Sequence, residues 1–104
     1  AKSIGTAVAM EVLKQKPDLV NKVVLCGVPT LDFNPGDEAY YQPLKTFPAV
    51  KILCIQNADD SHGGYTQVEK FLHSLNPNLK IISKPRSDHE YSYTEDFIVF
   101  LEND

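Results

Sequence analysis

The chain has 104 residues, which suits one domain built around a single hydrophobic core. Its 10 Lys and Arg residues and 14 Asp and Glu residues give a formal net charge of −4 at pH 7, which disfavours binding to nucleic-acid phosphates or to anionic membrane surfaces. No apolar run approaches the ~18 residues that a membrane span needs. We therefore expect a globular, cytoplasmic protein that binds neither nucleic acid nor membrane.

The first half of the chain predicts a helix, a strand and a connection. Residues 4–16 carry apolar side chains at spacings of three and four, which predicts a helix with one buried face. Residues 19–27 are apolar and rich in β-branched side chains, as in a strand buried on both faces. Residues 28–48 are polar, aromatic and turn-forming, with at most a short helix over 38–45. The predicted buried face of the first helix comprises Ile4, Ala7, Val8, Val12 and, as a further candidate, Met10.

The second half continues the alternation. It predicts a strand over 50–56, a polar turn over 57–64, a helix over 66–75, a strand over 79–84 and a helix that begins at Thr94 as its N-cap. Helices that alternate with apolar strands are typical of the α/β class, in which helices cover a mostly parallel, doubly wound sheet. The sequence shows no internal repeat and no linker, so we expect a single domain.

Three polar segments lie at positions where an open α/β sheet usually has its functional residues. In open α/β sheets, ligands bind beyond the carboxyl ends of the strands. Ser3 opens the first predicted helix, Asp59 and Asp60 follow the second strand, and His89 follows the third. Along the chain the order is therefore Ser, Asp, His.

This order and its local motifs resemble the α/β-hydrolase superfamily. Residues 1–5 (AKSIG) resemble the nucleophile elbow G-x-S-x-G, with Ala1 in place of the first glycine. Residues 52–60 resemble the strand and turn that carry the triad acid, and Asp60 aligns better than Asp59. Residues 87–91 (SDHEY) resemble the catalytic-histidine loop. The similarity covers nearly the whole chain and points to small cap-less esterases and dienelactone-hydrolase-like enzymes.

The resemblance implies a serine hydrolase that acts on a carboxylic ester or related acyl bond of a small molecule, with no cofactor and no metal. Ser3 is then the nucleophile, and His89 is the base that removes its proton. Asp60 holds the tautomer of His89 and stabilises the imidazolium. The backbone N–H of Ile4, at the start of the helix, supplies half of the oxyanion hole.

Two other readings of these residues remain open. A non-catalytic α/β-hydrolase homologue that acts as a binding module would keep the same architecture, because function lies in the site and not in the fold. Residues 1–3 also match the tail of a P-loop, G-x-x-x-x-G-K-[ST], except that Ala1 stands where that motif has glycine. Ser3 by itself also fits a helix N-cap, and Asp59 fits a turn former.

Several other polar side chains have a structural interpretation. We expect Cys26 and Cys54 to be buried, reduced thiols, because both lie inside predicted strands and lack the close Cys/His spacing of a zinc site. His62 and His73 are interpreted as exposed bystanders, and Tyr91 as a packing residue.

The substrate is the least visible property in the sequence. The connection over 28–48 is too short for a large lid, so we expect an open mouth. Its rim would be formed by Asp32, Phe33, Tyr40 and Tyr41.

The elbow lies at the start of the chain. In the family, a strand leads into this turn and an upstream loop supplies the second oxyanion N–H. We therefore expect residues 1–104 to form the C-terminal half of a longer α/β-hydrolase domain, with its last three strands, and to be inactive in isolation. The oligomeric state is not indicated by the sequence.

Overall fold

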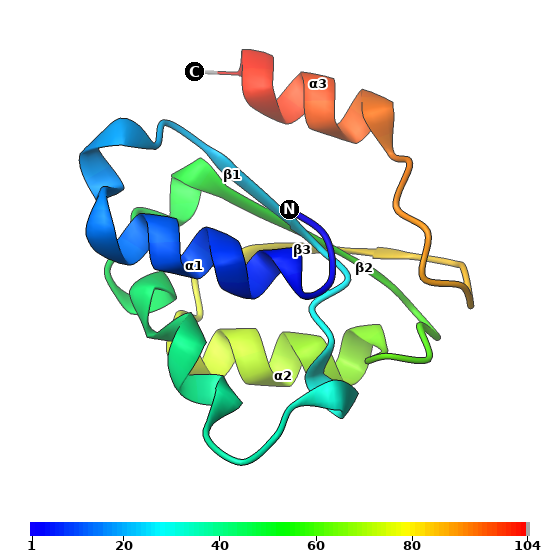
Figure 1. The fold of residues 1–104 in the computed structure, drawn as a ribbon. Coiled ribbons are helices and arrows are strands. Elements are labelled where there is room, and N and C mark those ends of the chain that lie inside the picture. The colour runs from blue at the N-terminus through cyan, green and yellow to red at the C-terminus, as the bar shows by residue number, and fades with distance from the viewer. Residues whose placement is uncertain (104) are drawn as a thin grey trace.

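Helices flank both faces of a three-stranded parallel sheet in the computed structural model, which describes residues 1–103 (Figure 1). The strands lie in the order β1-β2-β3, and both pairs are parallel. The predicted α/β class with a parallel sheet is thus confirmed. The main elements are α1 (Gly5–Gln15), β1 (Val23–Cys26), β2 (Ile52–Asn57), α2 (Tyr65–Leu75), β3 (Lys80–Lys84) and α3 (Thr94–Glu102).

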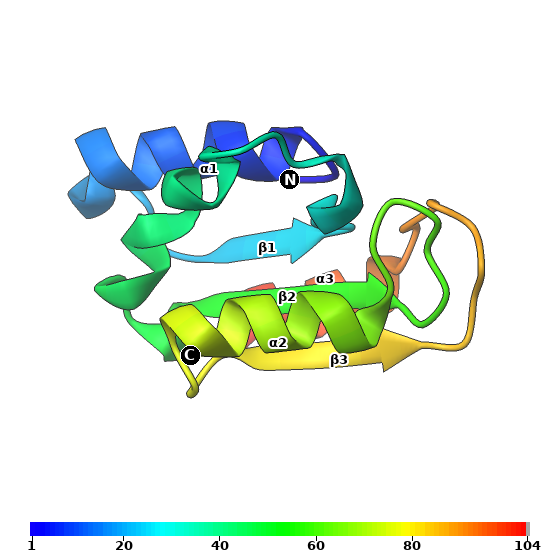
Figure 2. The ribbon, with the colours of Figure 1, turned by 90° about the horizontal axis from the view of Figure 1, so that it is seen from below.

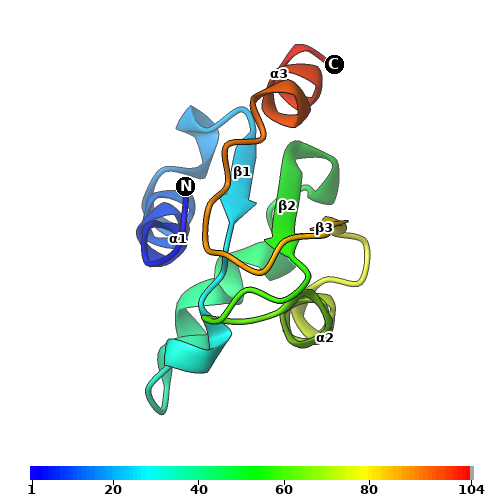
Figure 3. The same cartoon turned by 90° about the vertical axis from the view of Figure 1, so that its right-hand side faces the viewer.

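The two faces of the sheet enclose separate cores, because successive side chains of a strand point to opposite faces. On one face, Leu25, Ile52 and Cys54 pack beneath α1, α2 and the 3₁₀ helix η3 (Asp37–Lys45). On the other face, a smaller cluster packs against α3, which lies on the opposite side of the sheet from α1 (Figure 3). That cluster comprises Cys26, Leu53, Ile55 and Tyr91, with Phe97 and Phe100 of α3 packed against it.

Short 3₁₀ helices replace parts of the predicted strands. Pro17–Leu19 forms η1, so β1 begins at Val23 and not at residue 19. Ala49–Lys51 forms η4, so β2 begins at Ile52. Proline fixes φ near the helical value and lacks the N–H that a strand ladder needs, which favours a 3₁₀ turn after Pro17 and before β2.

The predicted buried face of α1 is wrong for three of its five residues: Met10 is buried and Ala7 packs against the core, but the other three face solvent. The side chains that enter the core are Thr6, Met10 and Leu13, whereas Ile4, Val8 and Val12 are exposed. The helix is oriented by its contact with η3, where the Thr6 hydroxyl lies 2.7 Å from the hydroxyl of the fully buried Tyr41. The predicted N-cap of α3 is also wrong, since Tyr93 occupies that position and no side chain caps the helix.

The carboxyl ends of all three strands lie at one edge of the sheet, next to the loops that carry Asp60 and His89. In Figure 2 the arrowheads of the three strands share one direction, and residues 58–64 and 85–93 lie beyond the ends of β2 and β3. The second of these segments crosses the ends of the strands on its way from β3 to α3 (Figure 3). Within residues 1–103, no helix is long and apolar enough to cross a membrane.

Candidate active site

Ser3 lies at the apex of a sharp turn between an extended segment and a helix. Residues 1–2 run parallel to the end of β1, where the Cys26 N–H donates to the carbonyl of Ala1 at 2.9 Å. The Ser3 N–H then donates to the carbonyl of Cys26 at 2.9 Å, and α1 begins two residues later. Ser3 has a φ of 56° and is the only non-glycine residue with positive φ among residues 1–103.

This backbone conformation is costly for any residue with a Cβ, by about 1–2 kcal/mol. Such strain persists where the surrounding structure holds it, and it is concentrated at functional sites. Here the surrounding hydrogen bonds hold it: the Thr6 N–H and the Thr6 hydroxyl both donate to the Ser3 carbonyl, at 2.9 and 2.7 Å. The strand-to-helix turn with a strained serine matches the geometry of a nucleophile elbow.

The backbone N–H of Ile4 is available at the N-terminus of α1. No acceptor for it is found among residues 1–103. The first N–H groups of a helix lack intrahelical partners, and the helix dipole favours negative charge at this end. The group is therefore suited to stabilise a negatively charged oxygen bound next to Ser3.

Asp60 is a buried carboxylate with three hydrogen-bond donors. Its Oδ2 accepts from the hydroxyl of Tyr91 at 2.5 Å and lies 2.6 Å from Nδ1 of His89, and its Oδ1 accepts from the N–H of His62 at 2.8 Å. Burial alone would raise the pKa of Asp60, but these bonds outweigh it, Tyr91 first and His89 second, and the pKa is held below its usual value. Asp60 is therefore ionised at neutral pH. Its neighbour Asp59 is exposed.

The Asp60 carboxylate sets the tautomer of His89. An ionised carboxylate only accepts hydrogen bonds, so Nδ1 of His89 carries the proton in this pair. The neutral ring then has its lone pair on Nε2, which is buried and has no partner among the residues described. The ring lies over the end of β1, since a Cβ placed on Gly27 would be 2.9 Å from Cε1 of His89.

The structure thus brings Asp60 and His89 into direct contact and places Ser3 at the same edge of the sheet. The Ser3 N–H donates a hydrogen bond to the carbonyl of Cys26, and the His89 ring lies against the next residue, Gly27. No hydrogen bond between the Ser3 hydroxyl and His89 is formed within residues 1–103. In serine hydrolases this bond is often long or poorly aligned in the absence of substrate.

Two residues of this network make contacts that the sequence does not indicate. Tyr91 packs in the core as expected, but it also donates to Asp60, and burial together with this bond raises its pKa. The sequence indicates an exposed bystander at His62, but its ring centroid lies 4.3 Å from that of His89. One signal for His62 was present in the sequence, because an Asp in a tight turn often bonds the N–H two residues on.

The remaining singled-out residues lie outside the network. His73 is part-buried at the other end of α2, where its Nε2 is 2.9 Å from the carbonyl of Leu79. Cys26 and Cys54 are buried free thiols, as expected, and burial raises their pKa values to about 11 and about 12. Residues 1–103 contain no cluster of three or more His, Cys, Asp or Glu side chains that could hold a metal ion.

A cavity of about 630 Å³ lies next to Ser3 and is lined mostly by apolar side chains. It contains all four predicted rim residues, Asp32, Phe33, Tyr40 and Tyr41. Its charged lining consists of Glu11, Asp32 and Asp37, with no Lys, Arg or His.

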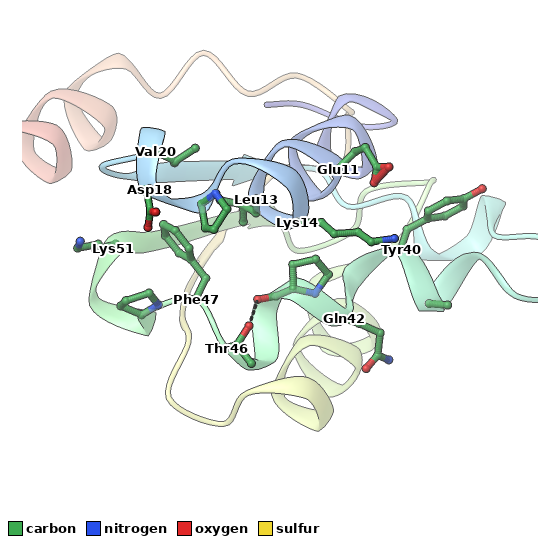
Figure 4. Close-up of a pocket in the computed structure, with 14 residues that line it drawn as sticks. Glu11, Leu13, Lys14, Asp18, Val20, Tyr40, Gln42, Thr46, Phe47 and Lys51 are labelled. Atoms are coloured by element: carbon green, nitrogen blue, oxygen red, sulfur yellow. Dashed lines mark hydrogen bonds between the residues drawn. The ribbon is translucent and has the colours of Figure 1, made fainter.

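A larger cavity of about 940 Å³ lies between the C-terminal half of α1, η1 and η3 (Figure 4). It contains none of Ser3, Asp60 and His89.

Comparison of the chain with protein-family models, with curated proteins and with solved structures gives no match.

Proposed function

We propose that this protein is a serine hydrolase of the α/β-hydrolase type, which cleaves a carboxylic ester or a related acyl bond. The observation that carries the proposal is the serine at φ 56° on the same sheet edge as the buried Asp60 carboxylate and the His89 ring bonded to it, whose Nε2 has no partner among residues 1–103. A strained serine, an oriented imidazole and an ionised carboxylate are the three groups that acyl transfer through a serine requires.

In the proposed reaction, the Ser3 hydroxyl attacks the carbonyl carbon while Nε2 of His89 takes its proton. The negative charge that develops on the carbonyl oxygen is stabilised by the N–H of Ile4. His89 then donates the proton to the leaving alkoxide, which leaves an ester between Ser3 and the acyl group. A water molecule that His89 deprotonates hydrolyses this ester and regenerates Ser3.

Asp60 acts on this sequence through His89. It keeps the proton on Nδ1, so that Nε2 can accept, and it stabilises the imidazolium that forms when Ser3 attacks. The three donors around Asp60 support this role, because they keep the carboxylate ionised at neutral pH.

The cavity next to Ser3 indicates where the acyl group would lie. At about 630 Å³, and with a mostly apolar lining, it is within the range of small-molecule sites. Because its charged lining is entirely carboxylate, we propose that the acyl group is uncharged or cationic and not anionic.

The test is covalent labelling of the natural full-length protein with a fluorophosphonate, read by intact mass and peptide mapping. We expect one adduct, on Ser3, in the wild-type protein and in Ser61→Ala, a matched serine control from the exposed part of the loop that carries Asp60. Ser3→Ala should not be labelled and should not hydrolyse esters. An adduct on another residue, or ester turnover retained in Ser3→Ala, would refute the assignment.

A non-catalytic binding module is the second candidate, and one observation favours it: Ser3 and His89 are not hydrogen-bonded to each other in the part of the chain described. In that case the full-length protein would take up no fluorophosphonate. It would still bind an uncharged or cationic small molecule at the cavity next to Ser3, which calorimetry or ligand-induced NMR shifts would detect.

A further inference from the structure

A second imidazole–carboxylate pair lies beside His89. Nδ1 of His62 is 2.7 Å from Oδ2 of Asp32, and the His62 and His89 rings are tilted by 43° with their centroids 4.3 Å apart. His62 comes from the loop after β2, and Asp32 ends the 3₁₀ helix η2 (Thr30–Asp32) after β1. The pair therefore joins two of the loops that form the candidate active site.

The backbone of His62 is fixed as firmly as its ring. Its N–H donates to Oδ1 of Asp60 at 2.8 Å, and its carbonyl accepts from the N–H of Leu31 at 2.9 Å. Three bonds thus hold this residue, and one of them ends on the carboxylate that also holds His89. The position of the His62 ring is therefore set relative to the Asp60–His89 pair.

His89 needs such support because its ring has one hydrogen bond, from Nδ1 to Asp60. A single bond allows the imidazole to rotate about it, which would move Nε2 away from the end of β1. Two aromatic neighbours restrict this rotation: His62 at 4.3 Å and Tyr91, whose ring is 5.8 Å away and nearly perpendicular. Tyr91 is buried, whereas His62 lies on the more open side and depends on Asp32 to keep its place.

We propose that Asp32 and His62 form a positioning pair, which holds the His89 ring so that Nε2 faces Ser3. The proposal rests on the proposed function for its consequence, a faster reaction at Ser3, but the restriction of the His89 ring is a property of the folded protein. His62 acts through His89 and is not itself in contact with the reacting atoms. Sequence reasoning assigned neither residue a role in catalysis.

The pair can be perturbed without unfolding the protein. Its side chains are 44% and 55% exposed, and exposed pairs of polar side chains contribute little to stability. His62→Ala removes the ring, and Asp32→Ala leaves the ring but removes its anchor. His62→Phe keeps an aromatic ring of similar size without the bond to Asp32. His73→Ala is the matched control, since His73 lies outside the site and bonds the carbonyl of Leu79.

The first measurement is the rate of fluorophosphonate labelling of Ser3 in the full-length protein. Displacing a catalytic group by a fraction of an ångström reduces rates strongly, so we expect His62→Ala and Asp32→Ala to label about tenfold more slowly. His62→Phe should recover part of this loss, and His73→Ala should label at the wild-type rate. Circular dichroism and thermal unfolding check that each variant is folded.

The second measurement does not depend on catalysis. The proton shared by Nδ1 of His89 and Asp60 should give a far-downfield ¹H NMR resonance, assigned by its loss in His89→Ala. If His62 restricts the ring, this resonance broadens in His62→Ala through faster exchange with water and stays sharp in His73→Ala. A resonance unchanged in His62→Ala would overturn the proposal. If the wild-type protein takes up no label, the proposed function fails, and the resonance alone decides on the positioning pair.

Discussion

Replacing Tyr91 by Phe removes one oxygen atom from the centre of the candidate site. The Tyr91 hydroxyl donates to Oδ2 of Asp60 at 2.5 Å and accepts from the N–H of Asn57 at 3.0 Å. Both bonds are buried, and Tyr91 is 6% exposed, so water does not readily replace the lost group. Phenylalanine keeps the ring and its packing, so the change isolates these two bonds.

Two physical effects set the magnitude. A hydrogen bond to a charged group contributes about 1.5–3 kcal/mol, and a buried N–H left without a partner costs about 1–3 kcal/mol. Since the two effects share one hydroxyl and are not additive, we expect Tyr91→Phe to lower the free energy of unfolding by about 2–4 kcal/mol. For a domain of this size, that corresponds to a fall in Tm of about 10 °C or more.

The assay is urea unfolding at several pH values, with Tyr65→Phe as the matched control. Tyr65 donates to Glu69 at 2.5 Å across one turn of α2, in a part-buried bond within a single helix, so its loss should change stability by less than about 1 kcal/mol. The pKa of Asp60 is lowered in the fold, so this carboxylate adds stability above its unfolded pKa, near 3.8, and loses that contribution as pH falls through the folded pKa. Without the bond from Tyr91, the pKa of Asp60 in the folded protein rises. The loss of stability in Tyr91→Phe should therefore be largest at neutral pH and become smaller below pH 4.

If Tyr91→Phe loses no more stability than Tyr65→Phe at neutral pH, the Tyr91 hydroxyl does not stabilise Asp60. A loss that does not change between pH 7 and pH 3 would also contradict the prediction, because the effect would then not involve the charge of Asp60.

Three further predictions concern the backbone of the site and its cavity. Gly27→Ala should destabilise the protein by about 1–3 kcal/mol and slow the labelling of Ser3, because φ is +63° and the added Cβ would lie 2.9 Å from His89. Gly36→Ala is the control: φ is +96° but the added Cβ meets open space, so the change should cost about 1 kcal/mol and leave labelling unchanged. Thermal unfolding and labelling rates check both variants. Ser3→Gly should be more stable than Ser3→Ala by about 1 kcal/mol in denaturant unfolding, because only glycine relieves the positive φ; equal stabilities would show that the turn is not strained. Among matched esters with neutral, cationic and anionic six-carbon acyl chains, the anionic one should show the highest KM, and neutralising Glu11 and Asp37 of the cavity should narrow the difference. Equal KM values for the three esters would contradict the role of the cavity carboxylates.

The sequence by itself determined the class of the fold. Short β-branched runs and helical spacing are local patterns, and they predicted the three strands and the helices that alternate with them, with errors of a few residues at most boundaries. The order Ser, Asp, His was equally visible, because each residue follows a strand or opens a helix. Parallel strands bring their carboxyl ends to one edge, so this order also indicated that the three side chains share that edge.

Tertiary contacts decided the rest, because they join residues that are far apart in the chain. The α1 helix turns Thr6, Met10 and Leu13 inward because it packs against η3. The spacing of apolar residues within the helix does not indicate the position of η3. Whether Asp59 or Asp60 faces His89 depends on how the loop after β2 meets the loop after β3, 29 residues later.

The pairing of His62 with Asp32 and the φ of Ser3 belong to this second class. Asp32 and His62 lie 30 residues apart, and they meet because β1 and β2 are neighbours in the sheet. Ser3 is held at φ 56° by bonds to Cys26 and Thr6, one of them 23 residues away. Local sequence decides which elements form, but the energy that holds a strained serine and orients an imidazole comes from the packing of those elements on one another.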